Sequence, residues 1–340
     1  MQIDFHHTVI FILARLAGFG LKESNLIAAC SQFVDDATDN EVIRFENGES
    51  YQSIYSAHSH LDYKNFDELD NHHIWIPFHF LPNGMQQNTF YDEICCRPNS
   101  RVAQDMLAEC LRQKNMPNAL YRLGVTMHVF ADTWAHQGFA GIKHEQNKVF
   151  YCDDNETSTH LADRIKDFFE DSLDNVTRQF PDKLLPLGHG AVLTYPDLPF
   201  LQWEYKTIQG QLIKRDNTAI FLDAINHIFI YLQQFLGVSK PVELPPIHMK
   251  KFQELLSKFD DKNGDTRHQQ WMEAIKESAF GEIGSIDEIQ ISKWKSDALH
   301  TLKDTSYFAQ TSWKYFQDSL KEHHFYMLHL LDEKYHICVA

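Results

Sequence analysis

Three residues in the middle of the chain combine metal-binding side chains with the spacing of a helix. His128, Asp132 and His136 recur at every fourth position within LYRLGVTMHVFADTWAHQGFAG, residues 120–141. Four helical residues turn by about 40° beyond a full circle, so the three side chains are expected on one stripe. The neighbouring residues are mostly apolar, which predicts a buried helix. Buried titratable groups are costly unless they are paired or bound to a cation. Imidazole and carboxylate together are the ligand set of zinc and related metals.

The same stripe also has an interpretation without a metal. His128 and Asp132 would then form a buried hydrogen-bonded pair, with His136 as an incidental third group. The metal site is the favoured hypothesis, and the 20 histidines of the 340-residue chain add a little weight to it. A metal cluster also needs ligands from other elements.

Two segments earlier in the chain carry acidic residues or histidines that could join this stripe. His6 and Asp4 stand at the start of the first predicted helix, where Asp4 is equally well explained as a helix cap. Asp35 and Asp36 end an apolar helix, SNLIAACSQFV. Negative charge is unfavourable at a helix C-terminus, so we expect at least one of these two acids to face a cation.

Other histidines are weaker candidates. His79 interrupts the apolar segment IWIPFHFLP, and His189 with Asp197 lies in the loop GHGAVLTYPD. A lone histidine among apolar residues is as often a satisfied core group as a ligand. The remaining histidines are expected to be structural or exposed, in particular His7, His58, His60, His72, His73, His144, His160, His323, His324, His329 and His336.

The elements that would position these side chains are predicted to be mostly helices. Apolar residues at helical spacing indicate helices near 5–17, 24–34, 100–113, 158–180, 216–236, 248–259, 268–280, 287–303 and 306–335, beside the His128 helix. Residues 72–84 contain two prolines and are expected to be an extended loop or short strand. We therefore expect a mainly α fold with few strands. A metal-binding helical domain would span residues 1–236, and a C-terminal helical region at 248–340 would pack on it.

Bulk composition narrows the function classes. A formal net charge of −16 argues against a stable complex with nucleic acid. The six cysteines form no C-x-x-C pair, and the N-terminus lacks the basic leader of a signal peptide. These features favour reduced thiols and a cytoplasmic protein, with leaderless secretion left open. No transmembrane segment is expected. The motifs of serine hydrolases, P-loop enzymes, zincin proteases and ferritin-like bundles are absent.

The order of these motifs resembles a known superfamily, the zinc-dependent phospholipase C and S1/P1 nuclease enzymes. The stretches that carry the resemblance are DFHHTVIFILARLAGF, SQFVDDAT, WIPFHFLPNG, LYRLGVTMHVFADTWAHQGFAG and GHGAVLTYPDLP. They cover most of residues 1–236. The chain is also similar to a bacterial family without a known activity. The resemblance implies a mainly helical domain that holds two or three zinc ions and hydrolyses phosphoester bonds.

The resemblance also implies a role for each matching position. His128 would be a ligand, Asp132 a bridging ligand, and His136 a ligand of the neighbouring metal. Asp36 or Asp35 would serve as ligand and general base, while His79, His6, His189 and Asp197 would complete the shells. The superfamily uses a processed N-terminal residue as a ligand, which this sequence does not offer, so Asp4 would substitute or that metal would be absent. The expected substrate is a phosphoester small molecule or a phospholipid. The alternative is a non-catalytic, metal-stabilised structural or interaction protein, or one without metal.

Overall fold

The fold is mainly helical, as the sequence predicts. The computed structural model describes residues 1–57, 68–84, 89–154, 192, 194–288, 290–300 and 305–338. In these ranges the helical elements are η1 (Asp4–Val9), α1 (Ile10–Ala17), α2 (Leu21–Asp36), α3 (Glu68–Phe78), α4 (Phe90–Ile94), α5 (Arg101–Arg112), α6 (Ala119–Ala135), η3 (Glu145–Asn147), η5 (Tyr195–Asp197), α10 (Asn217–Phe235), α11 (Pro246–Lys258), α12 (Gly264–Lys276), α13 (Ile291–Ala298), α14 (Thr305–Phe308) and α15 (Ser312–Tyr335). The predicted helix at 158–180 lies outside the described residues.

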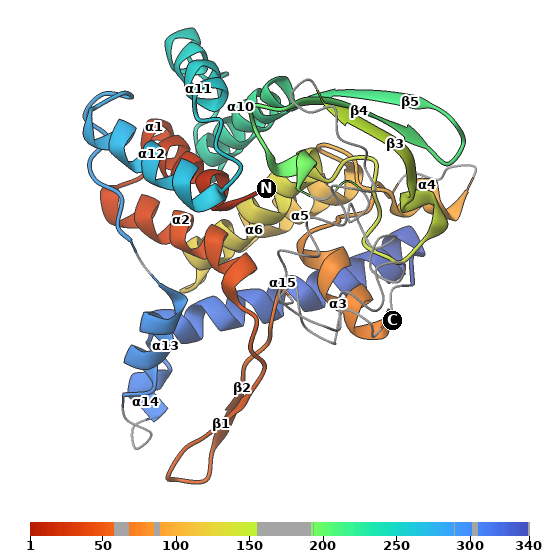
Figure 1. Ribbon diagram of the computed structural model, residues 1–340. Helices are drawn as coiled ribbons and strands as arrows, with labels where there is room; N and C mark the ends of the chain where they lie inside the picture. Colours follow the sequence, from red (N-terminus) through yellow and green to blue (C-terminus); the bar gives the residue numbers. More distant parts are fainter. Residues whose placement is uncertain are drawn as a thin grey trace.

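Helix α6 is the centre of the molecule. It packs against α2, α5, α10 and α15, and these helices surround it (Figure 1). The contact with α2 is especially close at Gly124, where a Cβ atom would lie 2.5 Å from the Cβ of Cys30 and 2.6 Å from the carbonyl oxygen of Ile27. Only glycine allows this approach. It brings the next turn of α6, which carries His128, against the backbone of α2.

Five short strands form two antiparallel sheets within the described residues. Strands β1 (Val42–Arg44) and β2 (Ser50–Gln52) make a hairpin that projects from the helices (Figure 1). Strands β3 (Val149–Asp154), β4 (Gln202–Thr207) and β5 (Leu212–Asp216) follow one another in the second sheet. Strand β5 runs directly into α10, whose N-terminus is capped by the side chain of Asp216.

One segment differs from the sequence prediction. We expected residues 72–84 to be a loop or strand, but they begin inside helix α3, which contains Pro77. Proline leaves the carbonyl of the residue four positions earlier without its helical hydrogen bond. That carbonyl belongs to His73, and the Nε2 atom of His324 donates to it at 2.9 Å. The tertiary contact with α15 therefore compensates for a helix-breaking residue.

The histidines of α15 are correspondingly not all on the surface, contrary to the sequence prediction. His323 is fully buried, its ring stacks on Phe78, and its Nε2 atom donates to the carbonyl of Pro77 at 2.8 Å. These contacts fix the end of α3 just before His79.

The C-terminal helices share the main hydrophobic core with the first 236 residues. Phe252, Trp271 and Met327 belong to the same buried cluster as Leu13 and Met127. Helix α12 packs on η1, and α15 packs on α3 and α6. Four cysteines, Cys30, Cys95, Cys96 and Cys110, are buried free thiols, as expected. Across the described part of the chain, no helix has both the length and the apolarity needed to cross a bilayer.

Candidate metal centre

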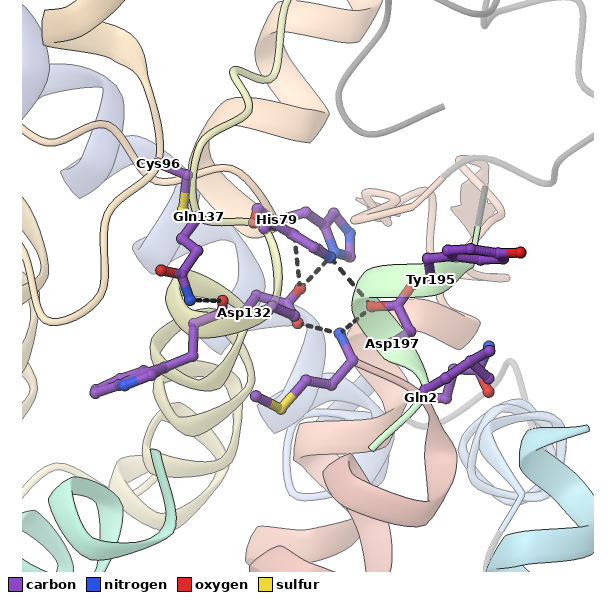
Figure 2. Close-up of polar contacts among 12 residues, drawn as sticks. Gln2, His79, Cys96, Asp132, Gln137, Tyr195 and Asp197 are labelled. Atoms are coloured by element: carbon purple, nitrogen blue, oxygen red, sulfur yellow. Dashed lines mark hydrogen bonds and ion pairs between the residues drawn. The ribbon is translucent and has the colours of Figure 1, made fainter. Parts of the chain in front are cut away.

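The carboxylate of Asp132 is the centre of a buried cluster of titratable groups. Its side chain is 1% exposed. Its Oδ2 atom lies 3.2 Å from Nδ1 of His79 (Figure 2). The same atom lies 3.3 Å from Nε2 of His128. These two ring nitrogens are 3.3 Å apart. The predicted stripe on α6 therefore meets His79, which follows α3, at one point.

Backbone carbonyls fix the orientation of both rings. The other nitrogen of His128, Nδ1, lies 2.8 Å from the carbonyl oxygen of Ser31 on α2. The other nitrogen of His79, Nε2, lies 2.9 Å from the carbonyl oxygen of Ser56. A carbonyl only accepts, so both outer nitrogens carry hydrogen. In a neutral ring the nitrogen that faces Asp132 then carries a lone pair.

This arrangement places three electron pairs against one another without a donor. Two imidazole nitrogens and one carboxylate oxygen converge within about 3.3 Å. A ligating histidine typically donates its outer N–H to a carbonyl or carboxylate, which orients the inner nitrogen toward the metal. Without a cation, only protonation of one ring relieves the repulsion. Although burial opposes it, the hydrogen bond to Asp132 and the charge of Asp35 raise the pKa of His79.

The second oxygen of Asp132 faces the first turn of the chain. Oδ1 lies 2.6 Å from the amine of Met1 and 3.2 Å from Nε2 of His6. The amine also lies 3.2 Å from Oδ1 of Asp197 (Figure 2). Despite complete burial, these two carboxylates raise the pKa of the amine to about 11. They also surround it with negative charge, and Met1 in turn helps to hold the pKa of Asp132 well below its usual range, against the effect of burial.

His6 is the least satisfied side chain of the cluster. It is fully buried, and neither ring nitrogen has a hydrogen-bond partner among the described residues. Its ring stacks on that of His128 with centroids 3.8 Å apart. Burial, together with the nearby His128 and Met1 amine, lowers the pKa of His6 to about 4. His6 is therefore neutral at pH 7, and one of its two ring nitrogens carries a lone pair inside the protein.

Asp35 and Asp36 diverge, although they are neighbours in the sequence. Oδ1 of Asp35 lies 3.7 Å from Nε2 of His128 and 3.8 Å from Nδ1 of His79. The side chain of Asp36 instead accepts a hydrogen bond from Gln32 at 3.0 Å. Consecutive helical residues point about 100° apart. Only Asp35 shares the helix face of Ser31, whose carbonyl orients His128.

His136 lies at the end of α6 rather than within it. Its Nδ1 atom donates to the carbonyl of His79 at 2.8 Å, and its Nε2 atom lies 3.6 Å from Oδ1 of Asp197. The buried guanidinium of Arg215, on β5, donates to the carbonyls of Trp134, Ala135 and Gln137. A cation at the last carbonyls of a helix is favourable. Arg215 thus fixes the helix end that carries His136.

Two proposed ligands are not brought to this cluster. Asp4 forms a buried ion pair with Arg267 on α12 instead, with Nε to Oδ2 at 2.7 Å, and Asp36 faces Gln32. His189, with His58 and His60, lies outside the described residues. The structure also places the amine of Met1 against Asp132, although the sequence analysis expected no N-terminal group in the site. The available signal was the resemblance to the superfamily, whose processed N-terminal residue is a ligand.

The donor set fits a divalent cation. His79, His128 and Asp132 each offer a ligand atom, and these atoms lie within 4.8 Å of one another. His6, Asp35 and His128 form a second such group. The two groups share His128. Nitrogen and oxygen donors at this spacing suit zinc.

Comparison with known proteins gives a family but no activity. No curated protein and no solved structure matches the chain. A family model matches residues 1–331, which is nearly the whole chain and includes every residue of the Asp132 cluster. The protein therefore belongs to a family of unknown function, DUF6765.

Proposed function

We propose that this protein is a metal-dependent hydrolase of phosphoester bonds, with zinc as the metal. The observation that carries the proposal is the convergence of His79, His128 and Asp132 with their lone pairs facing one another. With both rings neutral, a cation between these atoms would satisfy them, and a proton on one ring is the metal-free alternative. The order of the ligands along the chain also agrees with the resemblance to phospholipase C and S1/P1 nucleases.

The proposal includes two positions for a cation. The first position lies between His79, His128, Asp132 and Asp35. The second position, on the His6 side, would lie beside Nε2 of His6 and Oδ1 of Asp132, which are 3.2 Å apart, and so differs from the group of His6, Asp35 and His128. At the second position the protonated amine of Met1 supplies positive charge while no metal is bound, so a cation there competes with a proton. We therefore expect the first position to bind more tightly.

Metal and protein residues would have different roles in the reaction. Bound zinc lowers the pKa of a coordinated water and neutralises phosphate oxygens. Asp132 would offer one carboxylate oxygen to each position, and the carbonyls of Ser31 and Ser56 keep His128 and His79 in the tautomer that a metal needs. Asp35 orients the attacking water and accepts its proton, because it is the carboxylate at the solvent side of the cluster.

Exposure favours catalysis over a structural metal. The side chain of Asp35 is 33% exposed, whereas those of His6, His79, His128 and Asp132 are at most 4% exposed. A structural zinc site is closed by four protein ligands, whereas a catalytic site keeps one position open to water or substrate. The accessible side of Asp35 provides that opening. The non-catalytic, metal-stabilised protein remains the second candidate.

The acidic chain favours compact substrates. With a net charge of −16, long polyanions are repelled from most of the surface. We therefore propose a small phosphoester or a phospholipid headgroup as the substrate class, ahead of nucleic acid.

One experiment tests metal and activity together. The purified protein is stripped with a chelator, titrated with zinc by calorimetry, and analysed for metal by mass spectrometry. Each state is assayed with bis(p-nitrophenyl) phosphate and with p-nitrophenyl phosphorylcholine. We expect zinc binding and zinc-dependent release of p-nitrophenol from at least one substrate. Absence of zinc binding would refute the proposal. Stoichiometric zinc without turnover of either substrate would favour the non-catalytic alternative.

A further inference from the structure

The first turn of the chain is held between the Asp132 cluster and helix α12. Met1 and His6 face Asp132. Gln2, Asp4 and His7 face α12 instead. In Figure 2 the side chain of Gln2 extends away from Asp132. This short segment therefore contacts the Asp132 cluster with some of its residues and helix α12 with others.

Arg267, on α12, is the main contact on the outer side. Its guanidinium is fully buried and donates four hydrogen bonds. Two go to the carboxylate of Asp4, at 2.7 and 3.1 Å. The others go to Oε1 of Gln2 at 2.7 Å and to the carbonyl of Asp261 at 2.6 Å. A planar guanidinium with this many partners fixes direction as well as distance.

The local backbone transmits this constraint to His6. The carbonyl of Gln2 accepts hydrogen bonds from the N–H groups of Phe5 and His6, at 2.9 and 3.0 Å. These bonds begin η1, a π-helix, and the hydroxyl of Thr8 donates to the carbonyl of Asp4. Isolated π-helical turns are rare and are often found at functional sites. A shift of Gln2 or Asp4 would therefore move His6.

Two further contacts join the same elements. Nδ1 of His7 lies 2.8 Å from Nε2 of His268, the residue after Arg267. At Gly264, the first residue of α12, a Cβ atom would lie 2.7 Å from Oε1 of Gln2 and 3.2 Å from its Cβ. Glycine at this position allows α12 to approach Gln2.

We propose that Arg267 is a positioning residue for the His6 side of the metal centre. This inference rests on the proposed metal site and adds a role for the C-terminal region. Helix α12, more than 250 residues from η1 in the sequence, sets the place of His6 and Met1 against Asp132. Arg267 contacts none of the residues assigned above to the two cation positions. It acts through Gln2 and Asp4.

The test compares the two metal positions within one protein. Zinc is titrated into the stripped full-length chain, and the affinities of the first and second equivalents are measured by calorimetry. In Arg267→Lys we expect the second equivalent to bind at least tenfold more weakly, with the first changed less than threefold. In Gly264→Ala, whose extra methyl group crowds Gln2 without removing Arg267, we expect a smaller loss in the same direction. Lys276→Gln, at an exposed ion pair with Glu273 on the same helix, is the matched control.

The possible outcomes separate this inference from the proposed function. Equal loss of both affinities in Arg267→Lys and Gly264→Ala would show a general structural role and overturn the inference, as would unchanged affinities in both variants. A wild-type chain that binds a single equivalent would also overturn it, while leaving the proposed function intact. A wild-type chain that binds no zinc would refute the proposed function itself.

Discussion

Two buried polar clusters lie on opposite sides of η1, and they obey different rules. In the Arg267 cluster, formed by Gln2, Asp4, Asp261 and Arg267, a cation faces anions and carbonyls, and each contact joins a donor to an acceptor. On the Oδ2 side of Asp132, two imidazole nitrogens face a carboxylate oxygen, and no donor stands between them when both rings are neutral. The aspartate at the centre of each cluster is buried: Asp4 is 2% exposed and Asp132 is 1% exposed.

The difference shows how a structural cluster can be distinguished from a ligand site. Burial and residue type do not separate them, since each contains a fully buried aspartate. The decisive property is whether every buried acceptor in the cluster has a hydrogen-bond donor within the protein. The hydrogen bonds of Asp4 are all made with donors of the protein, which accounts for its absence from the candidate metal centre. Those on the Oδ2 side of Asp132 need an added positive charge, which either a proton on one ring or a cation supplies.

The largest expected effect comes from the carboxylate shared by both metal positions. In Asp132→Asn we expect zinc binding to be lost and hydrolysis to fall to background, by about 10³-fold or more, because the metal-activated nucleophile is lost. Elemental analysis and the p-nitrophenyl assays measure this. Asp4→Asn is the matched change in the other cluster and should retain the first zinc equivalent. Full zinc occupancy in Asp132→Asn would contradict the assignment.

The next effect separates the two neighbouring acids at the end of α2. In Asp35→Asn we expect turnover to fall by about 10²- to 10⁴-fold, the usual contribution of a general base. Asp36→Asn should leave turnover within about threefold, because Asp36 contacts Gln32 rather than the cluster. Initial rates at saturating zinc give the comparison. Equal losses in the two variants would remove the basis for choosing Asp35.

A third effect concerns stability. Zinc binds only the folded site, so at a free concentration 100 times the dissociation constant it should raise the free energy of unfolding by about 2.7 kcal/mol. Chelation should abolish the gain. Urea unfolding followed by circular dichroism measures it, and Asp132→Asn, which keeps the Arg267 cluster, should show no response to zinc. A zinc response of equal size in that variant would place the metal elsewhere.

The smallest effect tests a histidine that belongs to neither cluster. Burial lowers the pKa of His323 well below its usual range, so the folded protein keeps this ring neutral. The unfolded chain protonates it below about pH 6.5. Stability contributed by the neutral ring is therefore complete above that pH and is lost as pH falls, by up to about 1.4 kcal/mol per pH unit.

The variant His323→Gln retains a donor for the carbonyl of Pro77 but does not titrate. The free energy of unfolding of the metal-free protein, measured between pH 7.5 and 5.5, should fall less steeply in this variant than in the wild type. Identical slopes would show that His323 is accessible to protons in the folded state.

Much of the site followed from local pattern. The four-residue spacing of His128, Asp132 and His136 on an apolar helix predicted their convergence, and the structure places them around one point. The helical character of the chain followed from the same periodicity. The prediction of a loop or strand at residues 72–84 was wrong because a tertiary contact offsets the helix-breaking effect of a proline. His324 donates to the carbonyl that Pro77 leaves without its helical partner in α3. The sequence analysis did not predict the three-stranded sheet. That sheet matters for the site because Arg215, on β5, fixes the end of α6.

The sequence by itself determined that a buried helix carries a stripe of imidazole and carboxylate groups, because helical periodicity is a local property. Only the tertiary structure decided which partners meet that stripe. Asp35 faces it while Asp36 does not, and His6 does while Asp4 pairs with Arg267. These choices depend on distant elements whose approach is set by packing, such as α2 at Gly124 and α12 at Gly264. Neither contact produces a periodic pattern of residues in the sequence, so neither could be predicted from it.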